Sequence, residues 1–221
     1  MRNHRGIQAV SIAVITAGAA AMVLFAASRN VTPSDDAVLS EEVGRALSAE
    51  TLARLGGQGR IVVFARDTSE FPQPAADAAL DAFRRSLAES GHVVAATRLI
   101  AEDPLRPLRV PEGDVFDVLR KSKAGDVVVS FLGPALLSED QRGALGTTGH
   151  AAVVAFCPGA IPAVMDLRRL AGMGLLHGAV VARSRVAPAT PTPSGKAAFE
   201  AQYLRVDEKA LLGGIPAEAS R

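Results

Sequence analysis

From residue 60 onward, short apolar runs alternate with longer segments in which apolar residues recur every three or four positions. The run at 127–129 consists of three consecutive valines directly after Asp126. An unbroken β-branched run is typical of a strand that helices cover on both faces, whereas a half-exposed strand alternates apolar and polar residues. The chain is therefore predicted to form an α/β domain with this run as its central strand.

The same pattern predicts the sequence of strands and helices along the chain. Ser138, with Glu139 and Asp140 after it, is a typical start of a helix. We predict a three-layer fold, a mostly parallel sheet of five or six strands with helices on both faces. The flavodoxin-like order 2-1-3-4-5 is one possibility, and the sequence does not fix the order. The segment at 186–195 is expected to be a surface loop, and the tail from residue 207 has only a marginal pattern. Strands are expected at 61–65, 92–100, 126–134, 151–156, 175–182 and 203–206, and helices at 41–55, 74–90, 114–123, 138–145, 161–171 and 196–202.

The amino-terminal segment at 6–28 carries no charged residue. A helix of this length spans the roughly 30 Å of a bilayer core. Arg2 and Arg5 precede it, so the positive-inside rule places the amino terminus in the cytoplasm and the remainder outside. We predict a single-pass anchor in the inner membrane; the alternative is a secreted protein, with a signal peptide cleaved after small residues such as Ala27.

These features divide the chain into five segments. Glycines at 56–59 precede a strand, whereas a dinucleotide-binding loop follows one, so we interpret them as a flexible joint and not as a phosphate site. The expected segments are a cytoplasmic tail (1–5), a transmembrane signal anchor (6–28), a linker and helix (29–59), an extracytoplasmic α/β domain (60–206) and a C-terminal tail (207–221).

Composition excludes several classes of function. The 24 basic and 23 acidic residues nearly cancel, so nothing favours nucleic acid as a partner. Tryptophan is absent and Tyr203 is the single tyrosine, which argues against stacking platforms for bases or sugars. Cys157 is the single cysteine, so no intramolecular disulfide and no multi-cysteine metal site can form.

Two stretches resemble one lobe of a type I periplasmic binding protein. The strand Ile-Val-Val-Phe-Ala-Arg-Asp at 61–67 leads into a helical pattern that ends Gly-His-Val-Val at 91–94, and Gly-Asp-Val-Val-Val-Ser-Phe follows at 125–131. The resemblance covers about residues 60–183 and implies a half-binding-protein fold. Such proteins hold their ligand between two hinged lobes, whereas the exported part of this chain has room for one.

A candidate site follows if the strand order is flavodoxin-like. In the order 2-1-3-4-5 the topological switch point lies between strands one and three, and ligands bind beyond the carboxyl ends of the strands. Two arginines on this rim would suit a carboxylate or phosphate; the alternative is that the strand ends are polar simply because they meet water. The candidate ligand-binding residues are Arg66, Asp67, Thr68 and Ser69 after strand one, Ser130 and Gly133 after strand three, and Arg183 and Arg185 after strand five.

Residues for catalysis or metal binding are not assigned. Cys157 would need a nearby base to act as a nucleophile. His92, His150 and His177 precede strands, at the opposite edge of the sheet, so Cys157 is interpreted as a small buried apolar residue. The strand ends also lack the aspartate after strand three and the lysine after strand five of a receiver domain, and the glycine-containing phosphate loop of a flavodoxin. We expect no cofactor and no metal.

The sequence therefore favours a membrane-anchored, non-catalytic binding or interaction module. Its expected partner is another envelope protein or a second copy of the chain. Binding of a small anion or small molecule at the rim is the alternative. A hydrolase or transferase using Asp67, Thr68 or Ser130 is less favoured, because no suitable base is apparent.

Overall fold

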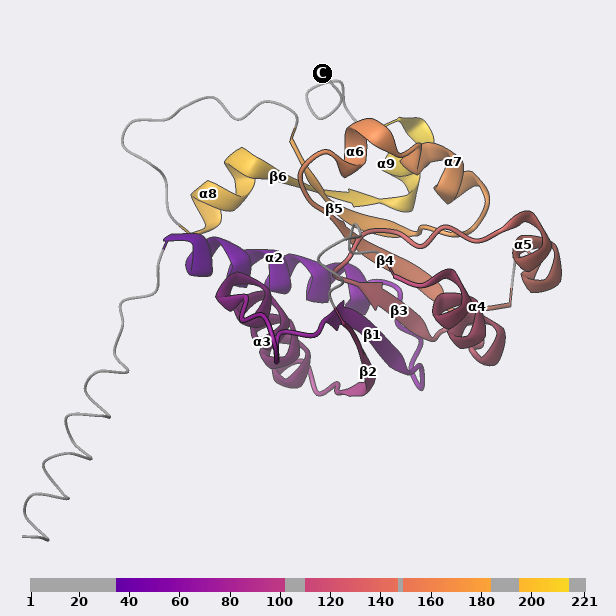
Figure 1. Ribbon diagram of the computed structural model, residues 1–221, viewed down its shortest axis with the longest axis horizontal. Helices are drawn as coiled ribbons and strands as arrows, with labels where there is room; N and C mark the ends of the chain where they lie inside the picture. The colour runs from indigo at the N-terminus through magenta and orange to yellow at the C-terminus, as the bar shows by residue number, and fades with distance from the viewer. Residues whose placement is uncertain (1–34, 102–109, 147–148, 184–194, 215–221) are drawn as a thin grey trace, which may run out of the picture. The chain divides into compact units, whose positions relative to one another are not determined.

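The computed structural model describes residues 35–101, 110–146, 149–183 and 195–214 (Figure 1). The anchor predicted at 6–28 lies outside these residues, as does most of the loop expected at 186–195. None of the helices in the described ranges has the length and apolar character needed to cross a membrane.

Six strands form one sheet in the order β2-β1-β3-β4-β5-β6. Strands β1 to β5 pair in parallel, and β6 pairs antiparallel with β5. The predicted mostly parallel sheet is therefore confirmed. Strands β1 to β5 have the flavodoxin-like order 2-1-3-4-5, which the sequence left open, and β6 is the edge strand expected at 203–206. The strands are β1 (Ile61–Arg66), β2 (Val94–Ile100), β3 (Val127–Ser130), β4 (Ala152–Cys157), β5 (Gly178–Ala182) and β6 (Tyr203–Asp207).

Helices cover both faces of this sheet, as predicted. One face packs against α2 (Asp35–Leu52), α3 (Pro74–Glu89) and α8 (Gly195–Gln202). The other face packs against α4 (Glu112–Lys121), α5 (Glu139–Leu145), α6 (Ile161–Val164), α7 (Leu167–Gly172) and α9 (Glu208–Gly213). We call these the α2–α3 face and the α4–α7 face.

The three valines of the central strand β3 show why this run is apolar without interruption. Val127 and Val129 lie in the apolar cluster of the α2–α3 face, and Val128 lies in the cluster of the α4–α7 face. All residues of β3 are buried. Successive strand residues point to opposite faces, so a strand covered on both sides needs apolar residues at every position.

The glycines at 56–59 form a packed turn, and their interpretation as a flexible joint is wrong. The Gly56 N–H donates to the Gly125 carbonyl at 2.9 Å. A Cβ atom at Gly59 would lie 1.8 Å from the same carbonyl oxygen. Glycine is needed here because two backbone segments approach closely.

Several element boundaries also differ from the prediction. The first helix begins earlier, at Asp35, and packs on the sheet. The helix expected at 161–171 is two helices, because Met165 is extended and the Asp166 carboxylate caps α7 by accepting from the Arg169 N–H at 2.8 Å. The tail after 207 forms α9, which buries Leu211 completely.

Candidate ligand-binding site

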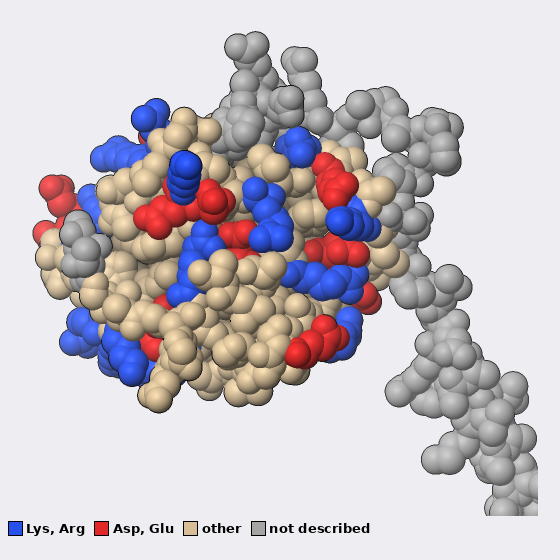
Figure 2. Space-filling model, turned by 180° about the vertical axis from the view of Figure 1, so that it is seen from behind, with Lys and Arg blue, Asp and Glu red and all other residues tan. Residues whose placement is uncertain are grey.

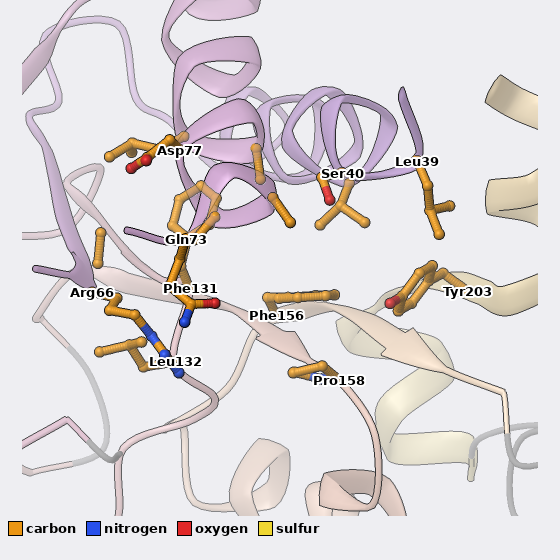
Figure 3. A pocket seen from close by; sticks show the side chains of 16 residues that line it. Leu39, Ser40, Arg66, Gln73, Asp77, Phe131, Leu132, Phe156, Pro158 and Tyr203 are labelled. Atoms are coloured by element: carbon orange, nitrogen blue, oxygen red, sulfur yellow. The ribbon is translucent and has the colours of Figure 1, made fainter. Parts of the chain in front are cut away.

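A cavity of about 320 Å³ lies at the carboxyl ends of β1, β3 and β4, where α2 and α3 approach the sheet (Figure 3). Its position follows from the crossovers. After β1 the chain passes to α3 on one face, and after β3 it passes to α5 on the other. Loops that leave neighbouring strands toward opposite faces open a crevice between them. The cavity therefore lies at the switch point between β1 and β3.

Aromatic side chains from three strand ends line this cavity: Phe131 after β3, Phe156 in β4 and Tyr203 at the start of β6. The rings of Phe156 and Tyr203 are tilted with centroids 5.5 Å apart, and Phe199 stacks on Tyr203 at 5.8 Å. On the other side, Phe83 meets Phe131 edge-on at 5.5 Å. These neighbours hold the cavity-lining rings in place.

Polar side chains also reach the cavity. Figure 3 shows Arg66, Gln73 and Asp77 toward one side, with Phe156 and Tyr203 toward the other. Burial raises the pKa of the Tyr203 hydroxyl, so this group is a neutral hydrogen-bond donor at physiological pH. The arrangement can hydrogen-bond a ligand at one end and stack against it at the other.

The predicted residues at the end of β1 lie at or beside the cavity. Arg66 lines it directly. The Thr68 hydroxyl donates to Asp77 Oδ1 at 2.8 Å and so orients a lining carboxylate. Asp67 instead serves the local turn: hydrogen bonds from the hydroxyl and the backbone N–H of Ser69 lower its pKa.

The predicted residues after β3 shape the turn below the cavity. Ser130 is 3% exposed, and its hydroxyl donates to the Gly133 carbonyl at 2.5 Å and accepts from the Leu132 N–H at 3.2 Å. Gly133 has a φ of +90°, and a Cβ there would lie 3.0 Å from Ile161 Cδ1. In the structure these groups are engaged in holding the turn.

Of the two arginines expected after β5, Arg183 is described, and it does not line the cavity. Arg183 donates from Nε to the Glu200 carbonyl at 3.0 Å. It lines a separate groove beside α2 and α8, which shares Tyr203 with the cavity. Arg185 lies outside the described residues.

Cys157 is buried, and the described histidines lie at the opposite edge of the sheet, as predicted. The Cys157 side chain is completely buried in apolar surroundings, and burial raises its pKa to about 12. His150 and His177, with ring centroids 6.4 Å apart, lie at the amino ends of β4 and β5. Within the described part of the chain, no group of three His, Cys, Asp or Glu side chains could hold a metal ion.

Sequence reasoning missed the aromatic lining. The scarcity of tyrosine and tryptophan argued against a stacking surface, yet Phe131, Phe156 and Tyr203 come together from three separate elements. Their signal was position: Phe131 and Phe156 each lie at the carboxyl end of a strand, and Tyr203 begins a strand that runs in the opposite direction. Antiparallel pairing brings the start of β6 to the same edge.

The comparisons with known proteins bear on the fold. No protein-family model matches the chain, and no curated protein matches it. A crystal structure of a periplasmic ribose ABC transporter from Conexibacter woesei is 11% identical, with a TM-score of 0.50 over 82% of this chain. The periplasmic component of an ABC-type sugar transport system from Hahella chejuensis is 12% identical over 65% of this chain and 49% of its own, with a TM-score of 0.42.

The likeness to the Conexibacter structure shows a shared fold, that of one lobe of a periplasmic binding protein, as the sequence resemblance predicted. The aligned region covers 63% of that structure.

Proposed function

We propose that this chain is a non-catalytic binding module that takes up a small molecule in the cavity at the carboxyl ends of β1, β3 and β4. The observation that carries the proposal is the cavity itself, which combines aromatic walls with a few polar side chains at the topological switch point. Concave, mostly apolar sites with a few placed polar groups are typical of small-molecule binding, and this edge is where open α/β sheets bind ligands.

The lining suggests the chemical class of the ligand. Phe156 and Tyr203 offer ring faces to an apolar surface, while Gln73 and Asp77 offer hydrogen-bonding groups. A small ring compound with one apolar face and polar groups at its edge, such as a monosaccharide, fits both features. That the structural neighbour is a periplasmic ribose transport protein supports this class.

The proposal also places the module outside the cytoplasm, held to the inner membrane by residues 6–28. The uncharged run and the preceding Arg2 and Arg5 support this placement. The periplasmic location stated for the neighbouring structure supports it too. Figure 2 shows basic and acidic side chains interleaved over one face of the molecule.

A thermal-shift experiment tests the binding function. The full-length protein, in mild detergent, is melted with monosaccharides, sugar acids and nucleosides, and so is the Phe156→Ala variant. A ligand at a hundred times its Kd stabilises the folded state by about 2.7 kcal/mol. For a chain of this size that raises Tm by roughly 5–10 °C.

We expect the shift to disappear in Phe156→Ala and to persist in Phe116→Ala, which truncates a half-buried ring on the α4–α7 face. No shift with any compound, or an equal shift in both variants, would reject this cavity as the site.

A further inference from the structure

Strand β2 is an exposed apolar edge of the sheet (Figure 1). Val93, just before it, is 79% exposed, and Leu99 is 55% exposed. Ala95 and Ala96 are exposed as well, and Arg98 is the single charged residue of the strand. A long apolar edge with one charge is a surface that pairs readily with another strand.

The outer side of the β2 backbone has no pairing partner among the described residues. The Ile100 carbonyl accepts from the Asp67 N–H at 2.9 Å, so Ile100 faces β1. By the alternation of strand residues, Arg98 also faces β1, while Thr97 and Leu99 turn their N–H and C=O groups outward. In the described part of the chain, no backbone group bonds to these outward groups.

The opposite edge of the sheet is protected. Strand β6 carries the charged Arg205 and Asp207, and the helices α8 and α9 flank it in the sequence. Arg205 forms an ion pair with Glu50 of α2, in which Nη2 lies 2.8 Å from Oε1. Charges and neighbouring elements are the usual protection of an edge strand, and β2 has only Arg98.

We propose that β2 pairs antiparallel with β2 of a second copy of this chain, joining the two sheets about a two-fold axis at Thr97. In this register Ala95 faces Leu99 of the second copy, and Ala96 faces Arg98. Ala95 and Leu99 therefore meet as apolar residues, and Arg98 lies opposite Ala96 and not opposite its own copy. A shift that centres the axis on Arg98 would place two like charges directly opposite each other, which is unfavourable.

The flank of the strand is compatible with a second copy. Arg84 of α3 donates to the Thr97 hydroxyl at 3.2 Å, so it lies beside the proposed axis. Asp81 accompanies it, with its carboxylate 3.7 Å from the guanidinium. Each copy therefore brings both signs of charge to the axis. A self-complementary patch of this kind is what a two-fold interface requires.

Site-directed cross-linking tests the register in the full-length protein with a Cys157→Ala background. Thr97→Cys places two thiols across the axis at a Cα separation of about 5.5 Å, within disulfide range. Leu99→Cys places them about 13 Å apart, out of range. We expect a disulfide dimer for Thr97→Cys and only background for Leu99→Cys and for Ala163→Cys, an exposed control on α6. Equal yields at all three positions would overturn the proposal.

Sedimentation of the detergent-solubilised chain provides the second readout. We expect Leu99→Lys to raise the dimer Kd about tenfold, because the new charge enters the interface once in each copy. Val164→Lys, which replaces an even more exposed residue (77%) on α6, should leave the Kd unchanged. A protein that is monomeric at every concentration, or a dimer insensitive to Leu99→Lys, contradicts the pairing. Ligand-induced thermal shifts should be the same in both variants, so this test is independent of the cavity.

Discussion

Glu50 of α2 is a buried carboxylate that holds two arginines. Its Oε2 lies 2.8 Å from Arg54 Nη1, and its Oε1 lies 2.8 Å from Arg205 Nη2. Arg54 also donates from Nε to the His177 carbonyl at 2.8 Å. Gly178 makes room for this cluster, since a Cβ there would lie 2.7 Å from Arg54 Cζ. Single residues thus tie α2 to the amino end of β5 and to β6.

We expect Glu50→Ala to lower the free energy of unfolding by about 3 kcal/mol, because it leaves the mostly buried Arg54 guanidinium without its charge partner. Glu42→Ala is the matched control on the same helix. It removes a more exposed pair with Arg45, which should cost less than about 1 kcal/mol. Urea unfolding measures both, and equal losses would show that the cluster contributes no more than a surface pair.

His177 is expected to make stability depend on pH. Burial lowers its pKa, with His150 and Arg54 contributing in the same direction against Glu208. Its Nδ1 accepts from the Val153 N–H at 3.1 Å, and protonation of that nitrogen would break the bond. Because the folded pKa lies below the unfolded value of about 6.5, the stabilisation is complete above that pH and is lost as pH falls below it.

Melting temperatures measured between pH 8 and pH 5 test this expectation. His177→Gln should melt lower than the wild type at pH 8, and its melting temperature should fall less between pH 7 and pH 5. Parallel curves for the two proteins would show that His177 does not titrate differently in the folded and unfolded states.

At the scale of elements, the pairing of α2 with α3 depends on one glycine. A Cβ at Gly44 would lie 2.1 Å from the Ala79 carbonyl oxygen. The backbones of the two helices therefore approach so closely here that no side chain fits between them. We expect Gly44→Ala to destabilise the protein by about 1–3 kcal/mol through overpacking, although alanine is the better helix former. Gly143→Ala in α5 meets no atom within 4 Å and should stabilise by about 0.5–1 kcal/mol. Chemical denaturation gives both values, and the same sign for both would contradict this account.

The elements also show what could be predicted from the sequence. The strands followed from apolar runs, but their order did not, and the flavodoxin-like order was one possibility among several. With that order, the switch point falls at the edge of the sheet where the cavity lies. The break at Met165 was not apparent, because Asp166 can either continue a helix or cap a new one, and tertiary packing decides. The aromatic walls were missed for a related reason: Tyr203 joins Phe131 and Phe156 only through the antiparallel pairing of β6, which a local pattern does not reveal.

At the scale of the whole molecule, Cys157 is a natural reporter of unfolding. It lies at the end of β4 inside the α4–α7 face, its side chain is fully buried, and burial raises its pKa to about 12. A thiol in this state does not react with a maleimide until the surrounding structure opens. Because it is the single cysteine of the chain, its labelling rate reports that opening without any engineered label.

We therefore expect Cys157 labelling at pH 7 to be slow without denaturant and to follow the global unfolding curve in urea. The exposed variant Ala163→Cys, in a Cys157→Ala background, gives the reaction rate of an accessible thiol. If the cavity binds a small molecule, saturating that site should slow Cys157 labelling, by about a hundredfold at a hundred times Kd, because only the folded state binds it. Labelling that is fast in water and insensitive to urea would instead mean that the end of β4 opens locally, without unfolding of the sheet.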